Sequence, residues 1–291
     1  AAVGAADGGP LVWIAPRFAL HQSLPVRATP SAVIAGDLAK EASDCGVPFI
    51  GIGLMYPRTV VRQRLMGGGA QHDAIEYIDW SDAPIHPARL ADGAAPRVHV
   101  HVPGATIAAA VWQVRAGRSM IYLLDTDIPE NAAWDRDLSS RSCEGDREAS
   151  LRQAVLLAAG AVELVERLET APRVWHLSGG QSAAVILERM HRLVDRGATF
   201  GEASAVVRES TVFATRTDAP PPADSYPIAA LDRCLGASWP ALAPHRAAVL
   251  AFGYHETDRN GTFNTAFDTE RRSAMQAAVT AETLRVMARW P

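Results

Sequence analysis

The stretch Arg173-Val-Trp-His-Leu-Ser-Gly-Gly-Gln-Ser-Ala-Ala184 decides the fold, because it predicts a strand, a tight turn and a helix in immediate succession. The apolar run from Val174 to Leu177 is typical of a buried strand, and Ser178-Gly-Gly180 is typical of a turn. Apolar residues at helical spacing follow from Ser182 to Arg192. Such a turn leaves free backbone N–H groups at the start of the helix, which suit an anion or a sugar hydroxyl. We therefore expect a ligand site at this edge of the sheet.

Strands and helices alternate along the rest of the chain, which predicts an α/β fold with a parallel sheet. The longest helical pattern runs from Glu148 to Glu169, and a shorter helix is expected from Gly36 to Cys45. An antiparallel strand excursion is expected in the first half of the chain, over residues 73–80, 97–102, 106–116 and 119–125.

The C-terminal third has weaker patterns. Residues 237–260 read as irregular, and residues 269–290 read as a closing helix. No linker divides the chain, so we expect one domain over residues 11–291, preceded by a flexible segment at 1–10 that does not resemble a signal peptide.

The composition narrows the class of protein. The 291 residues are 48% hydrophobic and 21% charged, as in an ordinary soluble globular protein. The net charge of −4 gives no reason to expect nucleic acid or an anionic membrane as a partner. No apolar run reaches the roughly 18 residues of a membrane span. The three cysteines are odd in number and far apart, which indicates reduced thiols and a cytoplasmic protein.

The basic residues also constrain the chemistry, because Lys40 is the only lysine beside 27 arginines. Any Schiff-base or phosphate-loop lysine would have to be Lys40. The residues before it, Gly36-Asp-Leu-Ala39, lack the glycine pattern of a phosphate loop. The match of Leu177-Ser-Gly-Gly-Gln181 to the signature of ABC transporter ATPases is therefore interpreted as coincidence.

Two pairs of side chains could hold a metal ion. Asp125 and Asp127 share one face at the end of a strand, but capping of that strand and of the next turn is the favoured reading. His99 and His101 also share a strand face, but no third ligand is evident. A solvent-facing polar row is favoured for this pair.

Two further groups of polar residues could serve either the structure or the chemistry of the protein. Gly145-Asp-Arg-Glu148 precedes the longest helix, so it either caps that helix or forms a polar loop that leans into a cleft. Ser178 and His176 could belong to a hydrolase triad. They lie two residues apart on one strand, outside a G-x-S-x-G turn, so this reading is disfavoured.

The order of several short motifs resembles that of the bacterial α-glucan (glycogen and maltodextrin) phosphorylases. Phe18-Ala-Leu-His-Gln-Ser-Leu-Pro25 is similar to the EFGLHESLP sequence of that family. The further motifs, in the family's order, are Ala35-Gly-Asp37, Ala42-Ser-Asp-Cys-Gly-Val-Pro48, Gly51-Ile-Gly-Leu-Met-Tyr56, Tyr122-Leu-Leu-Asp-Thr-Asp127, Pro129-Glu-Asn131, Asp135-Arg136, Gly145-Asp-Arg-Glu148, Val174-Trp-His-Leu177, Ser210-Thr-Val-Phe213 and Phe263-Asn264. The resemblance extends from about Leu11 to Trp290.

The resemblance implies a fold and an ancestral activity. The family folds as two Rossmann-like lobes of the GT-B type, with the active site between them. It uses pyridoxal phosphate, bound to a lysine of the C-terminal lobe, to split α-1,4-glucans with phosphate into glucose 1-phosphate. This chain resembles the N-terminal lobe alone. We therefore expect a single Rossmann-like lobe without the C-terminal cofactor lobe and without a pyridoxal phosphate site.

The chain departs from the family where the resemblance implies an active site. The family's glycine-rich GGLG loop aligns with Thr29-Pro-Ser-Ala32, and the proline removes a backbone N–H group. The histidine of the family's LNEGHSA motif is replaced by Gln181, and the histidine of THTP is replaced by Arg216. The fold is thus expected to persist while the phosphorylase chemistry is lost.

We accordingly expect a protein that binds a different small ligand, anionic or polyhydroxylated, at the remodelled edge. The predicted ligand-binding residues are Ser31, Asp146, Arg147, Ser178, Gln181 and Arg216. If the site is catalytic, His176 and Asp218 are the predicted acid–base residues, and no metal is expected. Arg216 is the main reason to expect an anion, since guanidinium groups suit carboxylates and phosphates.

The missing second lobe also bears on partners. A lobe face that the family buries would be exposed here, so we expect a homo-oligomer or a heteromeric partner chain. One alternative function is a non-catalytic subunit that pairs with a separate C-terminal lobe or glycosyltransferase. Another is a glycan-binding module, which ranks last because only 7% of the residues are aromatic and the sequence shows no stacked pair.

Overall fold

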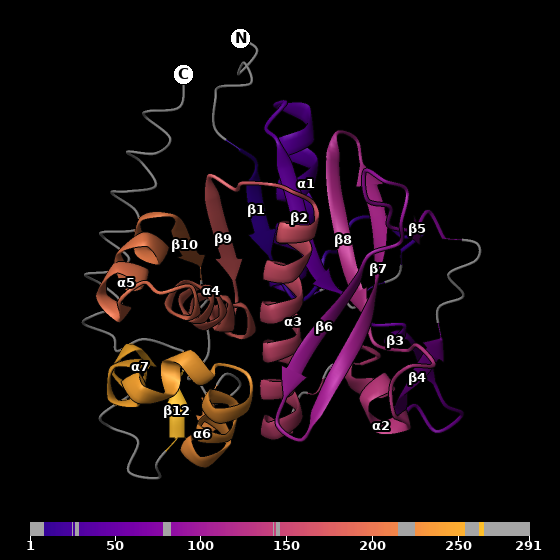
Figure 1. Cartoon of the computed structure of the whole chain (residues 1–291). Coiled ribbons are helices and arrows are strands. Elements are labelled where there is room, and N and C mark those ends of the chain that lie inside the picture. The colour runs from indigo at the N-terminus through magenta and orange to yellow at the C-terminus, as the bar shows by residue number, and fades with distance from the viewer. Residues whose placement is uncertain are drawn as a thin grey trace.

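An eight-stranded sheet organises the chain (Figure 1), with the strand order β10-β9-β1-β2-β8-β7-β5 and β6 paired to β7. The computed structural model describes residues 9–24, 26, 29–77, 83–141, 143, 146–214, 225–253 and 262–264. The strands of the sheet are β1 Leu11–Ile14, β2 Phe49–Leu54, β5 His86–Pro87, β6 Arg97–Val102, β7 Ala105–Ala116, β8 Ser119–Asp125, β9 Val174–Ser178 and β10 Thr211–Ala214.

The sheet has a parallel half and an antiparallel half. Each neighbouring pair from β10 through β9, β1 and β2 to β8 is parallel. Strand β7 then runs antiparallel to β8, β6 and β5. This confirms the predicted α/β class, and it confirms a parallel sheet with an antiparallel excursion in the first half of the chain.

Helices cover both faces of the sheet. Helix α1 (Pro30–Asp44) packs on one face, and α3 (Arg147–Arg167) and α4 (Ala184–Asp195) pack on the other. The remaining helical elements are α2 Ala133–Arg136, η2 Asp137–Ser139, η3 Gly180–Ala183, α5 Phe200–Glu209, α6 Ile228–Ala237, η4 Pro240–His245 and α7 Arg246–Gly253. Within the described ranges, none of the helices combines the length and the apolar composition that crossing a membrane requires.

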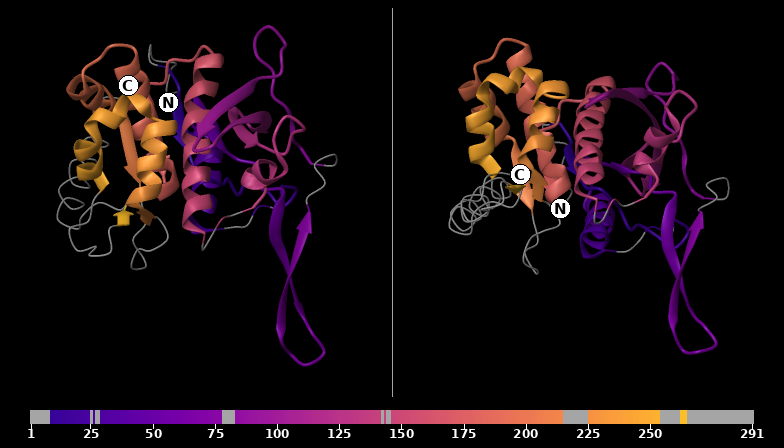
Figure 2. Two further views of the ribbon diagram at one scale, coloured as in Figure 1. Left: turned by 60° about the horizontal axis from the view of Figure 1, so that its bottom comes forward. Right: turned by 90° about the horizontal axis from the view of Figure 1, so that it is seen from below.

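Two small antiparallel pairs lie outside the main sheet. Strands β11 (Ser225–Pro227) and β12 (Thr262–Asn264) pair near the C-terminal helices. Strands β3 (Arg58–Leu65) and β4 (Gln71–Tyr77) form a hairpin that projects from the body (Figure 2). Three glycines, residues 67–69, lie at its tip.

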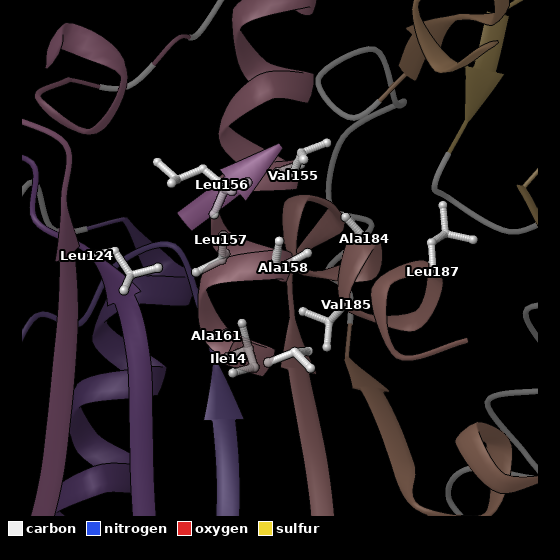
Figure 3. Packing of buried hydrophobic residues seen from close by; sticks show 14 of the residues in the cluster. Ile14, Leu124, Val155, Leu156, Leu157, Ala158, Ala161, Ala184, Val185 and Leu187 are labelled. Carbon is white, nitrogen blue, oxygen red and sulfur yellow. The ribbon is translucent and has the colours of Figure 1, made fainter. Parts of the chain in front are cut away.

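Helix α3 forms the centre of the larger core. Its apolar residues recur on all sides, because the sheet lies on one side of the helix and α4 and α6 lie on others. Figure 3 shows Leu156 and Leu157 of α3 in the same cluster as Ile14 and Leu124 of the sheet and Val185 of α4. Fully burying a leucine side chain contributes roughly 1.5–3 kcal/mol, so this helix supplies a large share of the hydrophobic stabilisation.

The structure corrects two sequence predictions. Helix α1 begins at Pro30 and not at Gly36, because the Thr29 side chain caps it and proline is well suited to the first helical turn. The segment predicted to be irregular contains η4 and α7 over residues 240–253. The predicted helix at 269–290 lies outside the described residues, and so does the segment at 1–8.

Gly36 offers a test of the packing between α1 and the chain after β1. A Cβ atom at Gly36 would lie 2.1 Å from the backbone oxygen of Ala19, and backbone cannot move aside as a side-chain end can. We expect Gly36→Ala to lower the free energy of unfolding by roughly 1–3 kcal/mol, as overpacking does.

The matched control is Gly201→Ala in α5, where an added Cβ would meet no atom within 4 Å. That change is expected to be neutral or to stabilise by up to about 1 kcal/mol through helix propensity. Urea denaturation measures both. Equal stabilities for the two variants would contradict the described packing of α1.

Candidate functional site

The five parallel strands end at one edge of the sheet, and the strand–turn–helix of β9, η3 and α4 lies at that edge (Figure 1). Gly179 turns the chain with a φ of 83°, a value that favours glycine. Its N–H donates to the backbone oxygen of Ala214 (2.9 Å), and its oxygen accepts from the Ser182 hydroxyl (2.7 Å). The predicted strand, turn and helix are therefore confirmed.

The turn leaves open space beside the backbone. A Cβ atom at Gly179 would meet no atom within 4 Å, although the residues on both sides, Ser178 and Gly180, are buried. The chain thus presents its backbone at the carboxyl ends of parallel strands, where ligands bind in open α/β sheets. A small molecule could approach the turn closely at this point.

Gln181 fastens this turn to helix α3. Its side-chain amide nitrogen donates to the Ser150 hydroxyl (3.1 Å) and lies 3.5 Å from the side-chain oxygen Oε1 of Gln153. Gln153 is fully buried and donates in turn to the backbone oxygens of Leu138 and Arg141. The amide donor of Gln181 is therefore engaged within the protein.

The sequence prediction missed Ser150 and Gln153. The sequence gives only a weak indication of their role. Both are polar residues at positions of the helix that the apolar periodicity assigns to the buried side. Their partners lie about thirty residues away along the chain.

Asp146 and Arg147 lie at the start of α3. The Asp146 carboxylate accepts from the backbone N–H groups of Glu148 and Ala149, at 3.1 and 3.0 Å. It therefore caps the helix, as the structural reading of this stretch predicted. Arg147 is exposed in the first helical turn.

His176 lies on the face of the sheet that α1 covers. Its ring stacks on Trp13 of β1, with the ring centroids 3.6 Å apart and the planes 10° apart. Burial lowers the pKa of His176 to about 4, so the imidazole is neutral near pH 7. Nδ1 of His176 and Nε1 of Trp13 are both buried and have no hydrogen-bond partner within the part of the chain that the structure describes.

The structure separates the other predicted site residues. Ser178 lies two positions after His176 in β9 and points to the same face, whereas Asp146 and Arg147 begin the helix on the opposite face. Ser31 lies in the first turn of α1, where its hydroxyl is 3.1 Å from that of Thr29. Arg216 and Asp218 lie outside the described residues.

The residue pairs considered for metal binding have structural roles. Asp125 accepts from the Trp112 indole (3.1 Å), and Asp127 pairs with Arg136 (2.7 Å). His99 and His101 are exposed on β6, as predicted for a solvent-facing row. Among the described side chains, no group of three or more His, Cys, Asp or Glu residues could hold a metal ion.

Lys40 is the only residue of this chain that could form the Schiff base that pyridoxal phosphate requires. A lysine that forms a Schiff base must be deprotonated and must face a cofactor pocket. Lys40 is among the residues that line a pocket of about 430 Å³, but its ammonium group pairs with Asp37 at 2.8 Å and its side chain is about half exposed. No step of a reaction can therefore be derived through this cofactor from the chain's own residues.

Comparison with known proteins identifies related sequences. The chain is 33% identical to a glycogen phosphorylase of Aquifex aeolicus over 219 residues, which is 75% of this chain and 32% of that protein. It is 31% identical to a maltodextrin phosphorylase of Thermococcus litoralis over 226 residues, or 78% of this chain and 27% of that protein. It is 35% identical to a glycogen phosphorylase of Mycobacterium tuberculosis over 231 residues, or 77% of this chain and 27% of that protein.

The alignment covers only a small part of each relative. No protein-family model matches the chain. About three quarters of the chain aligns, but it spans only about a third or less of each relative's length. Over that segment, the chain is a homologue of the glycogen and maltodextrin phosphorylases.

Proposed function

We propose that this chain is a phosphorylase-like protein that binds a small anionic or polyhydroxylated ligand beside Gly179 and does not itself phosphorolyse glucans. The observation that carries the proposal is the open space beside Gly179 in the turn after β9, which lies at the carboxyl edge of a parallel sheet. Preorganised N–H groups at the start of the following helix suit an oxygen-rich ligand.

The loss of phosphorolysis is supported by three positions. Lys40 pairs with Asp37 and does not suit a Schiff base. Gln181 stands where the resemblance places a histidine, and its donor is engaged with α3. Pro30 begins α1 where the resemblance places a glycine-rich loop, and proline has no N–H group to offer.

The ligand class follows from the groups near the edge. Arg216 follows the end of β10 by two residues in the sequence and lies outside the described residues; we propose that its guanidinium group favours a carboxylate or phosphate. Ser178 ends β9 beside the turn and would offer a hydroxyl. A sugar phosphate or a hydroxy acid carries both an anionic group for the guanidinium and a hydroxyl group for the serine.

We assign binding, and not acid–base catalysis, to the neighbourhood of His176. A general base is most effective when its pKa lies near the working pH. The pKa of His176 is about 4 because the ring is buried against Trp13, so it is a poor proton acceptor near pH 7. Asp218 stays the candidate acid–base residue should the site prove catalytic.

A second candidate function is a non-catalytic subunit that pairs with a separate chain. The observation that favours it is the outer side of α1, where Val33, Ile34 and Leu38 are each about 40% exposed. Apolar side chains gathered on one helix suit an interface. Co-purification of a second chain from the native host would favour this candidate, and a ligand that binds the lone chain would favour the first.

The ligand proposal predicts a specific charge effect. A thermal-shift screen of sugar phosphates, nucleotide sugars and hydroxy acids should give at least one anion that raises the melting temperature. Gln181→Glu should weaken the binding of that anion tenfold or more, because two like unit charges about 4 Å apart repel by about 1 kcal/mol in water and about 4 kcal/mol near a protein surface, and about 1.4 kcal/mol is tenfold in affinity.

The matched control is Gln71→Glu, which adds the same charge on the exposed β4 strand of the projecting hairpin. It should leave the affinity unchanged. If no anion binds, or if both variants bind the hit as wild type does, the proposed site is wrong.

The buried His176 leads us to expect that wild type and a variant without this histidine differ in their stability at acid pH. The pKa of this histidine is about 4 in the folded chain, against an ordinary 6.5, so the unfolded chain binds more protons between these values. The folded state therefore loses stability as the pH falls from 6.5 to 4, by up to about 3 kcal/mol. His176→Phe keeps a ring on Trp13 but removes the titration.

We expect the unfolding free energy of His176→Phe to fall less than that of wild type between pH 7 and pH 4.5, as measured by urea denaturation. His191, whose pKa is also lowered by burial, is present in both proteins, so its effect cancels in the difference. Parallel pH profiles for the two proteins would contradict a buried neutral His176.

A further inference from the structure

A pocket of about 210 Å³ lies beside the start of α3, and Gly179 is not among the residues that line it. Its walls come from the β6–β7 turn at 103–105, from α2, from the first two turns of α3 and from α6. These elements lie on the lower side of the molecule in Figure 1 and come forward in the left view of Figure 2. None of the site residues predicted from the sequence lines this pocket.

Trp134 of α2 is the most unusual residue of this pocket, because its side chain is 73% exposed. A tryptophan left in water exposes a large flat apolar surface, which is costly unless something covers it. The ring therefore offers a platform at the mouth of the pocket.

The charged groups around the pocket are paired with one another. Arg152 donates to Asp135 (2.5 Å), and Arg233 donates to Glu148 (2.7 Å). The two pairs balance in charge, so the pocket has little net attraction for an anion or a cation. A guanidinium group carries five N–H donors and a carboxylate has several acceptor sites, so both pairs retain hydrogen-bonding capacity.

Arg152 has a donor that the protein leaves unused. Its Nε is buried and has no hydrogen-bond partner in the ranges that the structure describes. An unsatisfied buried donor costs about 1–3 kcal/mol. Because this atom is closed to solvent, the hydrogen bonds to a bound ring come instead from the two ion pairs at the rim.

The floor of the pocket is apolar and uncharged. Leu151, Ala230 and Cys234 are all buried there. Burial raises the pKa of the Cys234 thiol to about 11, so it is protonated and adds no charge. The pocket thus combines an aromatic face, an apolar floor and a rim with balanced donors and acceptors.

We propose that this pocket binds a neutral, hydroxyl-rich ring, such as a pyranose sugar or a cyclic polyol. The apolar C–H face of such a ring fits against the Trp134 indole, and its hydroxyl groups both donate and accept at the two ion pairs. The pocket is smaller than the 300–1,000 Å³ typical of drug-sized ligands, so it takes a single ring. The proposal is independent of the ligand at Gly179.

The test is ligand-observed NMR and calorimetry on the full chain, with glucose, galactose, maltose and myo-inositol as neutral probes and glucose 6-phosphate as the anionic one. We expect at least one neutral probe to bind, with a Kd in about the millimolar range. Trp134→Ala should weaken that binding tenfold or more, and Trp134→Phe should retain part of it.

The matched control is Val206→Ala in α5, which removes an exposed apolar side chain far from the pocket in sequence and should change nothing. Failure of all the neutral probes to bind would overturn the proposal. So would a neutral probe that binds Trp134→Ala as tightly as wild type, or glucose 6-phosphate binding at a Trp134-dependent site that excludes the neutral probes.

Discussion

The burial of helix α3 against the parallel sheet is the constraint on which the rest of the described structure depends. Leu156 and Leu157 place the helix in the core, and Glu163 accepts a hydrogen bond from the backbone N–H of His99 in β6 (3.0 Å). Gly160 permits this approach, because a Cβ there would lie 2.6 Å from a methyl group of Leu124. Residues far apart in the sequence are thus fixed relative to one helix.

The same helix positions both candidate ligand sites. Ser150 and Gln153, in its first turns, hold Gln181 and therefore the turn at Gly179. Glu148 and Arg152, on the neighbouring side of those turns, line the pocket beside Trp134. An edge held in this way is preorganised, which lowers the entropic cost of ligand binding.

The sequence was sufficient to predict the strand–turn–helix at β9, because an apolar run, a glycine pair and helical spacing all agree there. It also predicted the antiparallel excursion. Helix capping was one of two readings of the stretch that contains Asp146, which was predicted to bind the ligand. The start of α1 was missed because Thr29 and Pro30 align with a loop in the related family, although they are good helix-start residues. Helix α7 was missed because prolines at 240 and 244 precede it.

The side-chain partners at the site could not be predicted in the same way. Gln181 binds residues on another helix, and Trp134 lines a pocket together with residues of α3 and α6 only because the tertiary fold brings these elements together. Such contacts depend on packing between elements, and local patterns do not contain that information. The opposite faces occupied by His176 and Asp146 likewise emerge only when the sheet is assembled.

Phosphate-dependent release of glucose 1-phosphate from glycogen and from maltodextrin, by the purified chain with pyridoxal phosphate added, is the most direct test of lost phosphorolysis. We predict no release above that of heat-inactivated protein. Release that requires phosphate and rises in proportion to the concentration of the chain would contradict the proposed loss of activity.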